Sequence, residues 1–116
     1  MGRLKSSEKE MSMEHYYRLV VPTTAFDRPA PADLVDGIRR MVKKSMASAF
    51  GGYTETRAVG GYVAQSGALI EEPVYLIEAS YETANGELVF QLAARIKSAL
   101  HQEAVMVRKD HEVYFV

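Results

Sequence analysis

Apolar side chains along the chain repeat with two different periods, which predicts an alternation of strands and helices. Residues 15–21 (HYYRLVV) are rich in aromatic and β-branched side chains and stop at Pro22, as is typical of a strand. Residues 34–49 instead carry apolar side chains at every third or fourth position, which predicts a helix whose first turn lies near Pro31. The first half of the chain therefore predicts a strand, a loop and a helix.

The middle of the chain predicts a β-hairpin. The pair Gly51-Gly52 follows the helical pattern, and glycine is the residue that most readily ends a helix in the left-handed conformation. Residues 53–64 and 69–81 are both strand-like. Residues 65–68 (QSGA) between them predict the turn.

Two features inside this hairpin predict irregular backbone. Gly60-Gly61 in the first strand predicts either a β-bulge or a place where another group packs closely against the backbone. Pro73 has no N–H to donate to a sheet. We therefore expect an edge or a kink just before the strongest strand, residues 74–81.

The last third of the chain predicts a second helix and a second hairpin. Asn85-Gly86 is a common hairpin turn, but the apolar period that follows is helical over about four turns, longer than a strand would run. We therefore expect a helix over residues 86–101. Residues 104–108 and 112–116 alternate as two short terminal strands.

This order of elements predicts a ferredoxin-like α+β fold. Its pattern is βαββαβ with an added C-terminal edge strand, which gives an antiparallel sheet with both helices on one face. The other face of the sheet is then uncovered and partly apolar, so we expect a homodimer or a higher homo-oligomer. We assign residues 14–116 to one domain and expect residues 1–13, which are polar and lack periodicity, to form a disordered tail.

Composition excludes several classes of function. The 116 residues contain no cysteine, which excludes disulfides, thiolate metal sites and a cysteine nucleophile. Fourteen basic and fifteen acidic residues give a net charge of −1, so no overall field draws the chain to nucleic acid, and we do not expect such a partner. No apolar run approaches the roughly twenty residues that span a bilayer, and the N-terminus lacks the apolar core of a signal peptide. We expect a cytoplasmic protein with no membrane contact.

The candidate binding residues are polar or ionisable side chains that a packed core does not require. We expect residues 50–54 and 101–103 to be neighbours, since we take both helices to run antiparallel to the strands they follow. Such a cluster around a glycine turn could hydrogen-bond a polar ligand, or it could simply satisfy turn and helix-end groups. The candidates are Thr54, Glu55, Arg57, Tyr62, Glu71, Gln102 and Glu103.

Other ionisable residues predict little chemistry. Glu71 and Glu72 are adjacent, so in a strand their side chains lie on opposite faces and cannot act as a carboxylate pair on one substrate. The three histidines lie in different predicted elements without the spacing of a metal site, so we expect neither a metal nor a cofactor. Basic residues on the first helix are typical of a solvated face opposite the core.

The chain carries five short motifs: Phe50-Gly51-Gly52-x-Thr54, Gly60-Gly61-Tyr62, Ser66-Gly67, Ile70-Glu71-Glu72 and Gln102-Glu103-Ala104-Val105. They resemble those of a family of small bacterial and phage-type proteins whose function is uncharacterised. The resemblance covers about residues 17–115 and departs from the family at Tyr62, where tryptophan is usual, and at Gly51. It implies a shared fold and surface, and no reaction.

We therefore predict a non-catalytic binding or regulatory module whose partner is a protein or a small polar molecule, and we assign no catalytic residue. Two alternatives remain open. The first is a cofactor-free enzyme of the dimeric α+β barrel type, in which Tyr17, Arg57, Tyr62 or a histidine polarises the substrate. The second, which rests on the resemblance, is a mobile-element accessory protein that sequesters a host factor or a small molecule.

Overall fold

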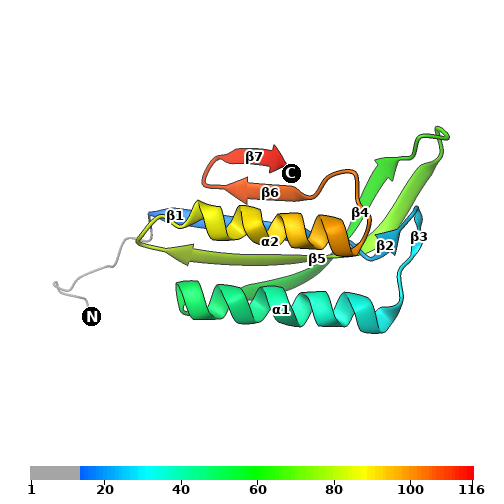
Figure 1. The fold of residues 1–116 in the computed structure, drawn as a ribbon. Coiled ribbons are helices and arrows are strands. Elements are labelled where there is room, and N and C mark those ends of the chain that lie inside the picture. Colours follow the sequence, from blue (N-terminus) through cyan, green and yellow to red (C-terminus); the bar gives the residue numbers. More distant parts are fainter. Residues whose placement is uncertain (1–13) are drawn as a thin grey trace, which may run out of the picture.

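The computed structural model describes residues 14–116, and the predicted N-terminal tail lies outside this range (Figure 1). Two helices and a five-stranded sheet make up most of the described chain, with a small two-stranded ribbon between the first strand and the first helix. In chain order the elements are β1 (His15–Val21), β2 (Thr24–Ala25), β3 (Arg28–Pro29), α1 (Ala32–Phe50), β4 (Thr54–Val63), β5 (Leu69–Tyr81), α2 (Gly86–Ala99), β6 (Met106–Lys109) and β7 (Glu112–Phe115).

The strand order confirms the predicted ferredoxin-like α+β fold. The main sheet has the order β4-β5-β1-β6-β7, and every neighbouring pair in it is antiparallel. Both helices lie on one face of this sheet (Figure 1). The added C-terminal strand, β7, is an edge strand beside β6, as the alternation of residues 112–116 predicted.

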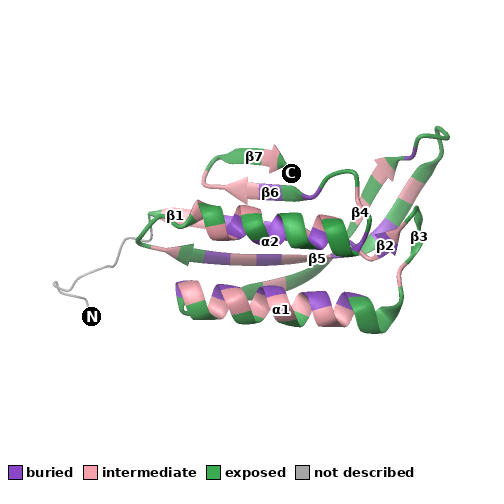
Figure 2. Cartoon of the chain, viewed as in Figure 1, coloured by how far each residue is buried: buried purple, intermediate pink, exposed green. Residues whose placement is uncertain are grey.

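The core lies between the helices and the sheet. Every second side chain of β1 is fully buried there, namely Tyr17, Leu19 and Val21. The buried side chains of α1 recur at the three-to-four spacing that predicted this helix, and Figure 2 shows buried positions on both helices and on β5. They are Val35, Ile38, Val42, Met46 and Phe50.

Local signals set the ends of the helices closely. Pro31 is the N-cap of α1, and Gly51 ends the helix with a φ of 84°, in the left-handed region that favours glycine. The Gly51 N–H donates to the Ala47 carbonyl at 2.9 Å. Helix α2 ends at Ala99, two residues before the predicted end at His101, whose own φ of 51° is left-handed.

Strands β4 and β5 form a long hairpin whose outer half, here called the arm, is residues 59–73. The arm extends beyond the rest of the sheet (Figure 1). Pairing is continuous from Thr54 opposite Glu78 to Val63 opposite Leu69, so the glycine pair forms no bulge within this hairpin. A Cβ atom at Gly60 would lie 3.1 Å from Val74 Cγ1, which confirms the other predicted reason for glycine, a close approach.

The arm is also where the edge predicted at Pro73 is found. Strand β1 ends opposite Tyr75, so residues 69–74 of β5 pair with β4 alone. The Pro73 carbonyl accepts a hydrogen bond from Thr23 Oγ1 at 2.7 Å, on the side away from β4. Because the N–H and C=O of one residue point the same way in an antiparallel ladder, the missing proline N–H costs no bond to β4.

Candidate functional site

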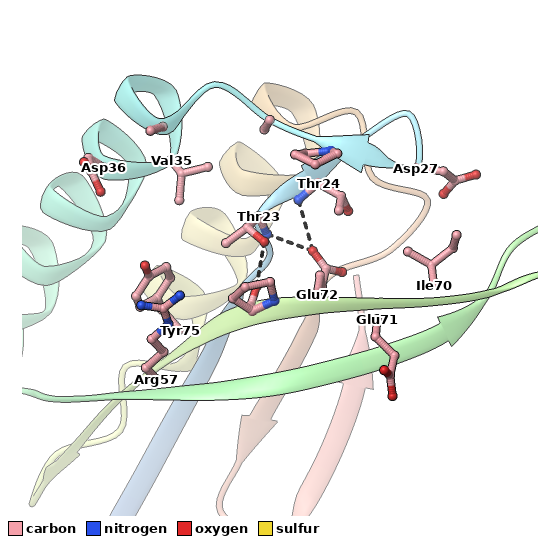
Figure 3. A pocket seen from close by; sticks show the side chains of 14 residues that line it. Thr23, Thr24, Asp27, Val35, Asp36, Arg57, Ile70, Glu71, Glu72 and Tyr75 are labelled. Atoms are coloured by element: carbon pink, nitrogen blue, oxygen red, sulfur yellow. Dashed lines mark hydrogen bonds between the residues drawn. The ribbon is translucent and has the colours of Figure 1, made fainter.

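A cavity of about 460 Å³ lies at the base of the arm, between the β2–β3 ribbon, the first turns of α1 and the β4–β5 hairpin (Figure 3). Its volume is in the range typical of sites for small molecules, roughly 300–1,000 Å³. Its apolar lining comes mainly from prolines, alanines, Val35 and Ile70. Its polar lining consists of Thr23, Thr24, Asp27, Asp36, Arg57, Glu71, Glu72 and Tyr75.

Glu72 is a buried carboxylate in the wall of this cavity, with a relative exposure of 6%. Its Oε1 atom accepts hydrogen bonds from the backbone N–H groups of Thr23 at 2.8 Å and Thr24 at 3.0 Å. No basic side chain within residues 14–116 forms an ion pair with it. Glu72 therefore ties the connection after β1 to the arm through hydrogen bonds, without a cationic partner in the described range.

Thr24 adds a second buried polar group. The residue is 5% exposed, and its Oγ1 atom has no hydrogen-bond partner within the described part of the chain. A buried hydroxyl without a partner costs free energy unless a ligand or a water molecule satisfies it. Thr24 is itself one of the residues that line the cavity.

The β2–β3 turn forms the outer wall of the cavity, although its residues predicted only a loop. Its two central residues, Phe26 and Asp27, have φ values of 52° and 59°, although such turns usually need glycine or asparagine. The Phe26 ring stacks on His101 at 4.5 Å between centroids, and Asp27 Oδ1 accepts a hydrogen bond from the Tyr62 hydroxyl at 2.6 Å. Burial and this hydrogen bond raise the pKa of Tyr62, so the phenol stays protonated as the donor.

At the other end of the cavity, two arginines contact one tyrosine. The guanidinium carbon of Arg39 lies 3.8 Å from the centroid of the Tyr75 ring, and that of Arg57 lies 6.0 Å from the same centroid. Arg39 is also paired with Asp36 at 2.9 Å. Arg57 makes no hydrogen bond or ion pair with any other residue of the described range, and it is the basic residue in the cavity lining.

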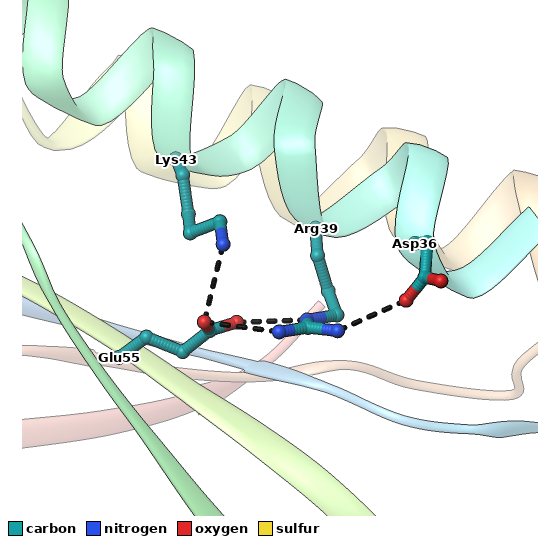
Figure 4. A network of polar contacts seen from close by, with 4 residues as sticks. All are labelled: Asp36, Arg39, Lys43 and Glu55. Carbon is teal, nitrogen blue, oxygen red and sulfur yellow. Dashed lines mark hydrogen bonds and ion pairs between the residues drawn. The ribbon is translucent and has the colours of Figure 1, made fainter.

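Glu55, a predicted binding residue, instead joins α1 to β4 (Figure 4). Its carboxylate accepts from Arg39 Nε at 2.8 Å, from Arg39 Nη2 at 3.0 Å and from Lys43 Nζ at 3.1 Å. The hydrogen bonds from Arg39 hold the pKa of Glu55 below its ordinary value, and the same contacts raise the pKa of Arg39. These bonds occupy both carboxylate oxygens, so Glu55 serves the packing of a helix on a strand.

Three other predicted residues, Arg57, Tyr62 and Glu71, lie at or beside the cavity. Figure 3 shows the Glu71 side chain on the opposite side of β5 from Glu72, as predicted for adjacent residues of a strand. Arg57 lines the cavity, and the Tyr62 hydroxyl donates a hydrogen bond to the lining residue Asp27. Arg57 and Tyr62 thus border opposite ends of one cavity, and the Glu71 side chain lies on the other side of β5 from Glu72.

The expected grouping of residues 50–54 with residues 101–103 is wrong. Strands β1 and β5 are antiparallel, so the helices that follow them run in opposite directions and end at opposite ends of the sheet (Figure 1). Thr54 pairs with Glu78 at one end. At the other end, Gln102 Nε2 donates to the carbonyls of Thr24 at 2.6 Å and Leu100 at 3.3 Å.

Glu103 lies at the same end as Gln102, where it accepts a hydrogen bond from Gln65 Nε2 at 3.0 Å and is exposed. The bond from Gln102 to Leu100 fits the alternative that these residues satisfy groups at a helix end.

Several lining residues did not stand out in the sequence. Thr23, Thr24 and Asp27 belong to a segment that predicted only a loop, and Tyr75 belongs to a strand that predicted only core. The position of this loop could have indicated the site, because a polar segment between a strand and a helix often borders a ligand site. Across residues 14–116, no group of three or more histidine, aspartate or glutamate side chains is placed to hold a metal ion.

Neither α1 nor α2 is long and apolar enough to cross a membrane.

Comparison with known proteins finds solved structures of similar fold but no matching sequence family. No protein-family model matches the chain, and a search of curated proteins finds no match. Among solved structures, a phage SAM lyase in complex with S-methyl-5'-thioadenosine superposes with a TM-score of 0.71 at 17% identity, over 94% of this chain and 93% of that one. A phage SAM lyase in the apo state gives a TM-score of 0.63 at 16% identity, over 93% and 95%.

These comparisons correct the functional prediction. Both structures are of an enzyme, and each match covers nearly all of both chains. The expectation of a non-catalytic binding or regulatory module is therefore wrong. The expectation of a small polar ligand agrees with the small molecule bound in the first structure.

Proposed function

We propose that this protein is a lyase that cleaves S-adenosylmethionine (SAM), or a closely related sulfonium nucleoside, and releases S-methyl-5'-thioadenosine. The observation that carries the proposal is the unpaired, buried Glu72 carboxylate in a ligand-sized cavity, within a fold shared with a SAM lyase.

The charges around the cavity favour a cationic ligand. Glu72 and Asp27 accept hydrogen bonds from neutral donors, so within residues 14–116 no cation neutralises them. Opposite unit charges about 4 Å apart attract by about 4 kcal/mol at the effective dielectric constant of a protein surface. A sulfonium ion gains this attraction, and the neutral thioether product does not, so cleavage also favours release of the product.

The reaction needs no added redox partner. The bond between sulfur and the γ carbon breaks with its electron pair moving to sulfur, which turns the sulfonium into a neutral thioether. As this bond breaks, the four-carbon fragment either closes a ring, because its own carboxylate attacks the γ carbon and displaces the sulfur, or loses a proton from the β carbon to a base and forms a carbon–carbon double bond. Each route balances atoms and charge without water.

The carboxylates serve binding more than the chemical step. The sulfonium loses its positive charge as the bond breaks, so a negative site stabilises the substrate more than the transition state. Rate acceleration must then come mainly from holding the four-carbon fragment in a reactive conformation. The fixed walls of the cavity, tied together by Glu72 and by the bond between Asp27 and Tyr62, suit that task.

Incubation of the purified protein with SAM tests this proposal. We expect release of S-methyl-5'-thioadenosine, measured by liquid chromatography with mass spectrometry. Glu72→Gln should lower kcat/KM by about 10- to 100-fold, a loss of about 1.4 to 2.7 kcal/mol of transition-state stabilisation. Glu87→Gln, an exposed carboxylate in the first turn of α2, should leave the rate unchanged.

Absence of both thioether release and SAM binding by calorimetry, with a folded protein, would rule the proposed function out. Thermal unfolding of Glu72→Gln separates a lost binding contact from a lost structural one. If this variant keeps wild-type turnover, Glu72 does not act in the site.

We also propose that copies of the chain associate through the face of the sheet that the helices leave uncovered. Met106 and Phe115 are paired on that face, and Val113 lies on it beside Arg108. All three apolar side chains are exposed, with Phe115 at 68%. A homodimer or higher oligomer would cover them. A cytoplasmic location and membership of the uncharacterised phage-type family remain part of this proposal.

A further inference from the structure

We infer that Arg57 binds the α-carboxylate of the substrate's amino-acid part, which would restrict the site to nucleosides that carry this group. The inference rests on the proposed function, since it names a recognition contact of the same cavity. Its evidence is the position of Arg57, its lack of a partner and its distance along the sheet from Glu72.

Arg57 is held at the cavity by its strand position. It lies on β4 directly opposite Tyr75 of β5, so the two side chains share one face of the sheet. The Tyr75 ring is half-buried, and its centroid lies 3.8 Å from the guanidinium carbon of Arg39 and 6.0 Å from that of Arg57. The Arg57 guanidinium therefore has an aromatic neighbour but no close contact to restrain its outer end.

The two arginines differ in what else they bind. Arg39 donates to the carboxylates of Asp36 and Glu55, which use its Nε, Nη1 and Nη2 atoms. Arg57 has no such partner in the described chain, and it is exposed to the cavity. A guanidinium presents two parallel N–H donors that match a carboxylate in a bidentate pair. Arg57 is thus the lining residue whose chemistry fits an anion.

The separation of charges along the cavity fits a zwitterionic ligand. Glu72 lies three residues from Tyr75 on β5, and Arg57 is opposite Tyr75. At a rise of about 3.3 Å per residue, the acidic and basic backbone positions are about 10 Å apart along the strand. Figure 3 shows Glu72 and Asp27 toward one end of the cavity and Arg57 toward the other. A ligand with a cationic centre and a carboxylate would meet both ends in one orientation.

Two thioether nucleosides that differ only in the carboxylate test this inference by calorimetry. S-adenosylhomocysteine carries the carboxylate, and its decarboxylated counterpart does not; neither has the sulfonium, so neither is cleaved. The wild-type protein should bind S-adenosylhomocysteine about tenfold more tightly, a difference of about 1.4 kcal/mol. Arg57→Gln should bind both equally, through loss of affinity for the carboxylate form alone.

Two further variants sharpen the comparison. Arg57→Lys should keep part of the preference, because a lysine supplies the charge without the bidentate geometry. Arg95→Gln, an exposed arginine of α2, should behave as wild type. Thermal unfolding confirms that each variant is folded.

The inference is overturned if Arg57→Gln keeps the preference, or if the wild-type protein shows none. That outcome leaves the proposed function standing as long as SAM is still converted to S-methyl-5'-thioadenosine. Failure of the conversion itself, together with failure to bind SAM, counts instead against the proposed function.

Discussion

Glu55, Glu71 and Glu72 belong to one hairpin, but their surroundings give them different roles. Glu55 is neutralised by Arg39 and Lys43 and packs a helix onto the sheet. Glu72 is buried against backbone N–H groups, and Glu71 points away on the other side of the strand. The sequence alone presents all three as similar acidic residues in strands. Their difference arises from which groups the fold places within reach.

The pairing of Glu55 predicts a specific dependence of stability on pH. Its pKa is held below the ordinary value of 4.5, chiefly by the hydrogen bonds from Arg39, so it binds a proton less readily folded than unfolded. Its contribution is therefore complete above that value and is lost as the pH falls through the lower pKa of the folded state. Glu55→Gln should lower the free energy of unfolding by about 1.5 to 3 kcal/mol at neutral pH.

Urea denaturation at neutral and acid pH measures this difference. The gap between wild type and Glu55→Gln should narrow as the pH drops below 4.5. Glu87→Gln, which has no such partner in the described chain, should show no comparable gap. A gap that stays constant down to strongly acid pH would mean that the ionic contacts contribute nothing.

The ends of the helices and strands follow the local sequence where a residue gives the backbone a strong conformational preference. Helix α1 begins after Pro31 and ends at Gly51, the two positions that the sequence marked. The β2–β3 ribbon shows the opposite case, since Phe26 adopts a left-handed φ that its side chain disfavours, next to Asp27, whose left-handed φ is better tolerated. Stacking on His101 and the hydrogen bond to Tyr62 hold that turn, and both contacts come from distant parts of the chain.

The end of α1 provides a matched test of backbone preference. Gly51 has a φ of 84°, whereas Gly52 does not have a left-handed φ, and an added Cβ would meet no atom within 4 Å at either position. Gly51→Ala should therefore lower the free energy of unfolding by about 1 to 2 kcal/mol, because only there does the Cβ clash with its own backbone. Gly52→Ala should change it much less. Equal urea midpoints for the two variants would show that α1 ends for another reason.

At the scale of the whole described chain, the fold has two layers, a pair of helices and a sheet, and the second face of the sheet is uncovered (Figure 1). Both helices cover one face of the sheet (Figure 1). Apolar side chains at the β6–β7 edge remain exposed on the other face. This arrangement supports the proposed self-association, and the arm adds a second projecting surface with the exposed residues Val59, Val63 and Leu69. The cavity lies at the base of that arm.

Self-association can be tested by a charge on the uncovered face. Phe115→Lys should lower the molar mass in size-exclusion chromatography with light scattering, because a lysine at an apolar contact must be desolvated. Leu34→Lys, which introduces the same charge at an exposed apolar residue of α1, should leave the molar mass unchanged. A wild-type protein that is monomeric at every concentration would contradict the proposal.

Most of the fold was predictable because it depends on contacts close in the sequence. The apolar periods set the helices and strands, Gly51 ends α1, and the turn at residues 65–68 fixes the hairpin register. Strand order followed from the order of elements and the short connections between them. These features need only the chain's own backbone preferences and the tendency of apolar faces to leave water.

The site depended on contacts that no local pattern records. Antiparallel β1 and β5 send the two helices in opposite directions, which separates Thr54 from Gln102 and breaks the predicted cluster. The same topology brings the loop after β1 against the arm, which buries Glu72 and leaves Arg57 facing the cavity. Which side chains meet there is set by three-dimensional packing between distant segments, and spacing along the chain carries no information about it.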